Sequence, residues 1–397
     1  MSLSPEIIEH IICFIDQSLY PITYYIFRNV LTLKPPSKLQ INELLLWASK
    51  IGNEQTCYLA KKWGADNLNK MLQVAAQKGH KHICQLAKKW GVNDFNWMLC
   101  MAAKGGHKHL CYLAKKWEAT DFDLMLFDAA LGGHEQLCQL ARDWGATKFN
   151  NMLYGAALGG HEHICYLAKK WGADNFNSML KTASREGHEH ICRLAKEWGA
   201  TDFNQMLYNA ACSGYEQLCY LAKEWGANDF NQMLYGAALR GHEHICYLAK
   251  NWGANNFNSM LRTASREGHE HICRLAKEWG ATNFNQMLYI STIGGYKNLC
   301  CLAKEWGATN FNRMLILATR GGNKDLCCLA KEWGATNFLL MLEIAIEKKN
   351  KELFLLAREW LTNNFGEISS LSFDEAVSYF KKYNNNDDDD NFDDFYI

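Results

Sequence analysis

Residues 176–201 read FNSMLKTASREGHEHICRLAKEWGAT, and this stretch decides the fold. It contains two sets of apolar residues at the three- and four-residue spacing of an amphipathic helix. The sets are Phe176, Met179, Leu180 and Ala183, then Ile191, Leu194, Ala195 and Trp198. Gly187 and Gly199 follow the two sets and fit the left-handed conformation that ends a helix. The stretch therefore predicts two short antiparallel helices, helix A followed by helix B.

The same pattern returns every 27 residues along most of the chain. Tryptophan marks this period without insertion or deletion, at Trp63, Trp90, Trp117, Trp144, Trp171, Trp198, Trp225, Trp252, Trp279, Trp306, Trp333 and Trp360. A strict period is typical of repeat proteins, whose units bury their apolar faces against their neighbours. Helices of about ten residues need such packing to be stable in water. We therefore expect an all-α helical-repeat solenoid of about twelve antiparallel helix pairs over residues 40–360.

Two columns of the repeat suggest structural roles. Asparagine or aspartate at the start of helix A predicts an N-cap, whose side chain accepts from first-turn amides. This column contains Asn69, Asn96, Asp123, Asn150, Asn177, Asn204, Asn231, Asn258, Asn285 and Asn312. Each tryptophan of the period could bury about 150–250 Å², which corresponds to at most about 4–6 kcal/mol. The tryptophan column is therefore the best candidate for the stabilising spine.

Cysteine also follows the period. Eleven of the sixteen cysteines share one column of helix B: Cys57, Cys84, Cys111, Cys138, Cys165, Cys192, Cys219, Cys246, Cys273, Cys300 and Cys327. Stacked helices lie about 8–10 Å apart, whereas the Cα atoms of a disulfide lie within about 7 Å. We therefore expect reduced core residues, and a chain that occupies the reducing cytoplasm.

Histidine occupies two further columns. Together with the cysteine column they give His-x-His-x-Cys, as in His188, His190 and Cys192. Imidazole and thiolate are zinc ligands, so a zinc-binding or redox-buffering protein is an alternative function. However, His188 and Cys192 share a helix face while His190 points elsewhere, so that no unit supplies a tetrahedral set alone. The sequence predicts no metal ligand and no cofactor.

Charge, hydropathy and motifs narrow the function further. The chain has 42 basic and 42 acidic side chains and no basic block, so a nucleic-acid partner is not expected. No run of 18 apolar residues occurs, and Glu9 and His10 interrupt the N-terminal apolar stretch, so neither a membrane nor a secretion signal is expected. Without a phosphate loop, a nucleophile elbow or a unique polar cluster, the sequence predicts a non-enzymatic monomer.

Two short motifs resemble the ankyrin repeat. They are AALGGH (residues 156–161) and the helix ending WGAD (residues 171–174), and related motifs cover most of residues 40–360. The resemblance implies a structural hydrogen bond for the turn histidine and a concave, protein-binding face lined by the first helices. The period is 27 residues instead of about 33, and Asn-x-Met-Leu replaces Thr-Pro-Leu-His. These departures imply a variant without the β-hairpin tip, similar to ankyrin-like proteins of large nucleocytoplasmic DNA viruses, and hence a viral host-interaction protein.

Helix A carries the variable chemistry of the repeat. Positions i, i+3 and i+7 form a stripe on its expected solvent face, which runs from Trp97, Cys100 and Lys104 to Arg313, Ile316 and Arg320. The stripe is rich in tyrosine and arginine, which are over-represented among binding hot spots. We predict a protein-binding surface formed by Trp97, Tyr154, Lys181, Arg185, Tyr208, Tyr235, Arg262, Arg266, Tyr289 and Arg320. The alternative is ordinary surface variation, with some tyrosines packed between units.

The ends of the chain depart from the repeat. LSPEII (residues 3–8) and IICFI (residues 11–15) resemble the start of an F-box. This resemblance implies docking to a ubiquitin-ligase adaptor through Pro5, Glu6, Ile7, Ile8, Ile11 and Ile12, with the repeats as the substrate receptor. The alternative is a helical cap over residues 1–34. Ser372 and Glu375 predict a capping helix within residues 361–383, and the six aspartates of residues 384–397 predict a disordered acidic tail.

Overall fold

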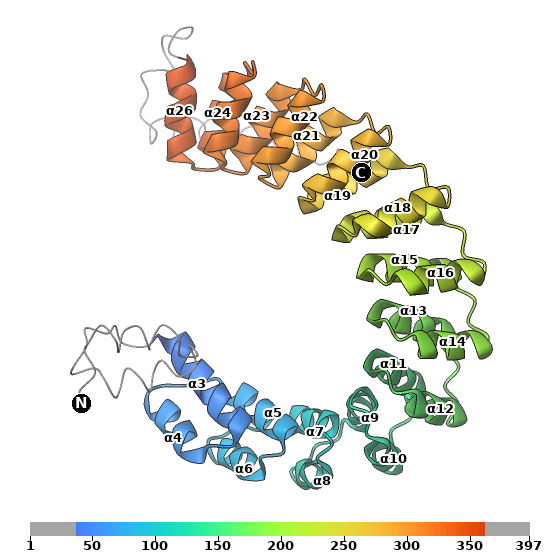
Figure 1. The fold of residues 1–397 in the computed structure, drawn as a ribbon. Coiled ribbons are helices and arrows are strands. Elements are labelled where there is room, and N and C mark those ends of the chain that lie inside the picture. Colours follow the sequence, from blue (N-terminus) through green and yellow to red (C-terminus); the bar gives the residue numbers. More distant parts are fainter. Residues whose placement is uncertain (1–36, 362–397) are drawn as a thin grey trace, which may run out of the picture. The chain divides into compact units, whose positions relative to one another are not determined.

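The computed structural model describes residues 37–361, which form 24 helices and contain no strand (Figure 1). This confirms the all-α helical-repeat architecture. The N-terminal segment of residues 1–34, the acidic tail and all but the first residue of the predicted C-terminal cap lie outside the described residues. The chain divides into two compact units, Met1–Asp202 and Phe203–Ile397, which are considered separately below.

Each unit contains six helix pairs within the described residues. In unit 1, the helices A are α3 (Lys38–Ile51), α5 (Leu68–Lys78), α7 (Phe95–Lys104), α9 (Phe122–Leu131), α11 (Phe149–Gly159) and α13 (Phe176–Glu186). Its helices B are α4 (Glu54–Lys62), α6 (Lys81–Lys89), α8 (Lys108–Lys116), α10 (Glu135–Asp143), α12 (Glu162–Lys170) and α14 (Glu189–Glu197). Within the unit, every helix A packs on its own helix B and on the next helix A.

Unit 2 repeats this arrangement. Its helices A are α15 (Phe203–Ser213), α17 (Phe230–Arg240), α19 (Phe257–Glu267), α21 (Phe284–Ile293), α23 (Phe311–Arg320) and α25 (Phe338–Glu347). Its helices B are α16 (Glu216–Glu224), α18 (Glu243–Asn251), α20 (Glu270–Glu278), α22 (Lys297–Glu305), α24 (Lys324–Glu332) and α26 (Lys351–Leu361). No helix in residues 37–361 combines the length and apolar character needed to cross a membrane.

The α13–α14 pair shows why the sequence forms these helices. Asn175 caps α13, because its side chain accepts from the amide of Ser178 at 3.1 Å. Gly187 ends α13 with a φ of 85°, a conformation that glycine adopts without steric cost. Its amide donates to the carbonyl of Ala183 and satisfies an acceptor of the last turn. α14 then begins after His188.

The Asn177 column does not form the N-cap, so the sequence-based prediction of its role is wrong. Asn177 lies inside the first turn of α13, and its Oδ1 accepts from the amides of Thr201 and Asp202 at 2.8 and 3.2 Å. Those amides belong to the loop that precedes the next helix A. The contact recurs from Asn42, Asn96, Asp123, Asn150, Asn204, Asn231, Asn258, Asn285 and Asn312 to the residues 24 and 25 positions later. Each of these ten residues therefore fastens its repeat to the next, whereas Asn69 of the predicted column makes no such contact within the described part of the chain.

The turn histidines form a second set of links between repeats. Nε2 of His161 donates to the carbonyl of Leu131 at 3.2 Å, and Nε2 of His242 donates to that of Cys212 at 3.1 Å. Each acceptor lies 30 residues earlier, in the last turn of the preceding helix A, where a carbonyl has no partner within its own helix. Burial lowers the pKa of His161, which favours the neutral ring.

The core consists of small and flexible apolar side chains. In the α13–α14 pair, Met179, Leu180, Ile191 and Cys192 are completely buried. The same columns are buried in the other repeats, and each large aliphatic side chain contributes about 1.5–3 kcal/mol on burial. The structure confirms the predicted core position of the cysteine column, because all eleven thiols are buried, and all are free.

The tryptophan column lies at the edge of this core, and its role as the stabilising spine stays a prediction. Apart from Trp279, which is 9 % exposed, the tryptophans of the period are only half-buried. Trp252 contacts the rings of Phe230 and Tyr220 with centroids 5.6 and 5.2 Å apart, and Nζ of Lys223 lies 4.4 Å from its ring centroid. The column therefore forms an aromatic and cation–π seam, worth about 0.5–1 kcal/mol per exposed cation.

Candidate functional site

All ten residues of the predicted partner-binding surface lie on helices A. Six of them are exposed, namely Trp97, Lys181, Arg185, Arg262, Arg266 and Arg320. The other four are the tyrosines Tyr154, Tyr208, Tyr235 and Tyr289, which are half-buried. Unit 1 therefore exposes Trp97, Lys181 and Arg185, and unit 2 exposes Arg262, Arg266 and Arg320, while the tyrosines of both units are partly covered.

The tyrosines pack between neighbouring helices A. The Tyr208 and Tyr235 rings stack with centroids 6.3 Å apart and an interplanar angle of 15°, and Tyr154 stacks in the same way on Phe127. Burial raises the pKa of Tyr208 to about 12, with a further contribution from its hydrogen bond to Cys212. The packing of tyrosines between units is thus confirmed for Tyr154, Tyr208 and Tyr235, whereas the binding role of the tyrosines stays a prediction.

One position of the predicted stripe is buried. Cys100 was expected on the solvent face of α7, but it is completely covered and lies against Asp128 of α9. Burial raises the pKa of the Asp128 carboxyl to about 6. Thr182 and Asn209 occupy the same column as Asp128 and are also buried. This part of helix A therefore belongs to the interface between repeats.

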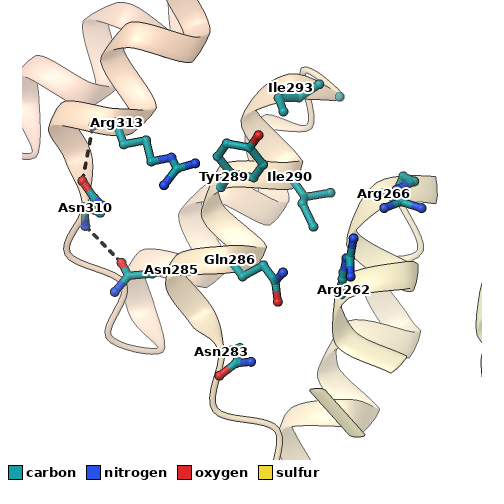
Figure 2. A pocket seen from close by; sticks show the side chains of 11 residues that line it. Arg262, Arg266, Asn283, Asn285, Gln286, Tyr289, Ile290, Ile293, Asn310 and Arg313 are labelled. Atoms are coloured by element: carbon teal, nitrogen blue, oxygen red, sulfur yellow. Dashed lines mark hydrogen bonds between the residues drawn. The ribbon is translucent and has the colours of Figure 1, made fainter. Parts of the chain in front are cut away.

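In unit 2 the helix-A surface is hollowed into a groove of about 920 Å³ across α19, α21 and α23. Figure 2 shows Arg262 and Arg266 on one helix, Gln286 and Tyr289 on the next, and Arg313 on the third. The remaining lining residues are Asn283, Asn285, Ile290, Ile293, Gly294 and Asn310. We call this site the arginine groove.

The arginine groove carries three positive charges and no lining carboxylate. Within residues 37–361, neither Arg262 nor Arg266 forms an ion pair. The Arg313 guanidinium lies 4.4 Å from the ring centroid of Tyr289, which fixes its direction but leaves its charge without an anion. Guanidinium groups bind carboxylates and phosphates with two parallel hydrogen bonds. The groove is therefore suited to an acidic ligand.

Of the eleven lining residues, only Arg262, Arg266 and Tyr289 belong to the predicted set. The other eight do not, and among them are Arg313 and the loop residues Asn283 and Asn310. The sequence contained a signal for Arg313, because it stands in the stripe column of Trp97. Asn310 is held by the link between repeats, since its amide donates to Asn285 Oδ1 at 3.1 Å, and its own Oδ1 caps α23. No helical spacing reveals these loop residues, because the folded connection brings them to the groove.

The histidine and cysteine columns do not assemble into metal centres. In the part of the chain that the structure describes, no three His, Cys, Asp or Glu side chains could hold a metal ion together. Nε2 of His188 donates to the carbonyl of Leu158 at 3.3 Å. Burial raises the pKa of the Cys192 thiol to about 12, which disfavours the thiolate that metals bind. Each column has a structural role that the repeat geometry explains.

Comparison with known proteins does not assign the chain to a family. Neither a protein-family model nor a curated protein sequence matches the chain. The resemblances to ankyrin repeats and to an F-box therefore rest on the quoted sequence motifs alone. The arginine groove and the exposed charged residues of helices A are the surface features that suggest a function.

Proposed function

We propose that this chain is a non-enzymatic scaffold that binds a protein partner along its helix-A face. The arginine groove carries the proposal. It offers an aromatic ring, three cations and several amide side chains in one depression of about 920 Å³. Arginine and tyrosine are the residue types that dominate binding energy at protein interfaces.

The contrast between the two helix types supports this proposal. On helix B, Glu189 and Arg193 form an ion pair four residues apart with an oxygen–nitrogen distance of 2.7 Å, and the pair recurs in unit 2. On α19, Arg262 and Arg266 have the same spacing but carry like charges. A like-charge pair at this spacing destabilises a helix by about 0.2–0.5 kcal/mol. The repulsion between these two arginines does not favour the fold, and an acidic partner would relieve it.

Binding to the arginine groove can be tested with two charge-matched triple variants of the full chain. R262Q/R266Q/R313Q removes three cations from the groove, and R274Q/K297Q/K351Q removes three exposed cations from helices B of the same unit. Each tagged chain is used to capture partners from eukaryotic cells, which are then quantified by mass spectrometry. We expect the groove variant to lose partners that the helix-B variant retains. Equal partner lists for wild type and groove variant would refute the proposal.

A deletion tests the adaptor role proposed for the N-terminal segment. The chain lacking residues 1–34 is captured beside the full chain under the same conditions. Loss of ubiquitin-ligase components with retention of the groove-dependent partners would support adaptor docking through Pro5 to Ile12. Identical lists would leave the N-terminal segment as a cap and would not affect the groove.

A further inference from the structure

Five of the six helices A of unit 2 together carry a positive charge, although the whole chain is neutral, and the sixth, α25, carries two glutamates. From α15 to α23 its helices A carry five arginines and one glutamate, a local charge of +4. The arginines are Arg240, Arg262, Arg266, Arg313 and Arg320. The compensating acidic charge must therefore lie elsewhere in the sequence.

Much of the opposite charge is concentrated in one segment. Residues 384–397 read NNNDDDDNFDDFYI and contain six aspartates and no basic residue. Three aromatic residues, Phe392, Phe395 and Tyr396, are interspersed with the acidic ones. This combination complements the groove, which pairs its arginines with the apolar side chains of Ile290 and Ile293. We propose that residues 387–397 occupy the arginine groove of their own chain.

The connecting chain is long enough for this contact. α26 ends at Leu361, and about 25 residues separate it from Asp387. At about 1.5 Å per residue, the rise of an α-helix, about 25 residues would span about 37 Å, and an extended chain would span about twice that or more. The α21–α22 and α25–α26 pairs belong to the same unit and are two repeats apart, or about 16–20 Å at the usual distance between packed helices. The tether therefore reaches the groove without full extension.

The tether also gives the tail an advantage over a free ligand. A short flexible linker produces an effective concentration on the order of 1 mM. If the free peptide binds with a Kd of about 100 μM, the tethered copy weakens the binding of an external acidic ligand by about tenfold. This inference rests on the proposed function, and it adds that the protein partner must displace the chain's own acidic segment.

The test measures how a labelled peptide with the sequence of residues 384–397 binds to three full-length chains by fluorescence anisotropy. The first is wild type, and the second has D387N, D388N, D389N, D390N, D393N and D394N. The third combines these tail substitutions with R262Q/R266Q/R313Q. We expect the second chain to bind the peptide about tenfold more tightly than wild type, which equals about 1.4 kcal/mol. The third chain should not show this increase in peptide affinity. In the second chain, 0.5 M NaCl should reduce the increase.

Four outcomes would overturn the inference. Equal affinity of the first two chains would show that the tail does not compete, and unchanged affinity of the third would place the peptide outside the groove. Sedimentation of wild type as a dimer that the arginine substitutions dissociate would place the tail in the groove of a second copy. If the peptide does not bind but the groove variant still loses cellular partners, the proposed function stands and the tail inference alone fails.

Discussion

Replacing Asp128 with asparagine should stabilise unit 1 at neutral pH. Asp128 is 5 % exposed and lies in the interface between α7 and α9, beside the Cys100 thiol. Burial raises the pKa of its carboxyl to about 6, although Lys104 opposes this shift. Asn209 occupies the same column three repeats later and is also buried, so the column accommodates an amide of this size.

The expected magnitude follows from proton linkage. The carboxyl is protonated more readily in the folded chain, whose pKa is about 6, than in the unfolded chain, whose pKa is about 3.9. The free-energy cost of ionising the buried Asp128 carboxyl is therefore absent below about pH 4. It increases between about pH 4 and 6 and is complete above about pH 6. A shift of about two pKa units corresponds to about 3 kcal/mol. An unpaired amide N–H in the variant could remove about 1 kcal/mol of this gain.

Hydrogen exchange of the α9 amides at several pH values is the suitable assay, because repeat arrays open locally instead of in one step. At pH 7 the α9 amides of D128N should open with a free energy about 2–3 kcal/mol higher than in wild type. This difference should shrink by about 3 kcal/mol as the pH falls to about 4. The reciprocal variant N209D should destabilise unit 2 at pH 7 and recover at pH 4. A D128N effect that is the same at both pH values would refute the reasoning.

Asn150→Ala removes the acceptor of two backbone amides and should lower the unfolding free energy of unit 1 by about 1–3 kcal/mol. Urea unfolding measures this loss. A loss near zero would mean that water replaces the side chain. Gly159→Ala would place a Cβ in steric conflict with the backbone oxygen of Leu131 in the preceding repeat. It should cost about 1–3 kcal/mol in the same assay, whereas Glu186→Ala in the same column should be nearly neutral. Iodoacetamide at pH 8 should label the half-buried Cys301 and Cys328 in the folded chain. The eleven column cysteines, whose thiol pKa burial raises to about 11 or about 12, should react only after unfolding, and peptide mass mapping distinguishes the two groups.

The helices were predictable because their signals are local. The apolar spacing and Gly187 placed helix A of the model repeat from Phe176 to the glycine, and α13 spans Phe176–Glu186. The role of Asn177 was not predictable in this way. Asn175 and Asn177 are both capable of capping a helix, and only the position of the following loop determines that Asn177 accepts from Thr201. Hydrogen bonds between repeats depend on how close residues of neighbouring repeats lie in space, and the sequence of one repeat does not show this.

The candidate site was predictable as a surface but not as a groove. Helical spacing identified Arg262, Arg266 and Tyr289 as residues of one face. It also assigned Cys100 to solvent, because the spacing cannot show how closely neighbouring helices A approach.

The hydrogen bonds of the asparagine and histidine columns join only adjacent repeats. This restriction has a consequence for the gene. Residues 182–201 and 263–282 are identical and lie 81 residues apart, which is three periods. Unequal recombination between the two coding stretches would delete or duplicate 81 residues in register. Each asparagine and histidine near the new junction would still meet the same type of partner in its neighbour. Copy number can therefore change between generations in blocks of three repeats, which varies the row of helix-A side chains without disturbing the bonds between repeats.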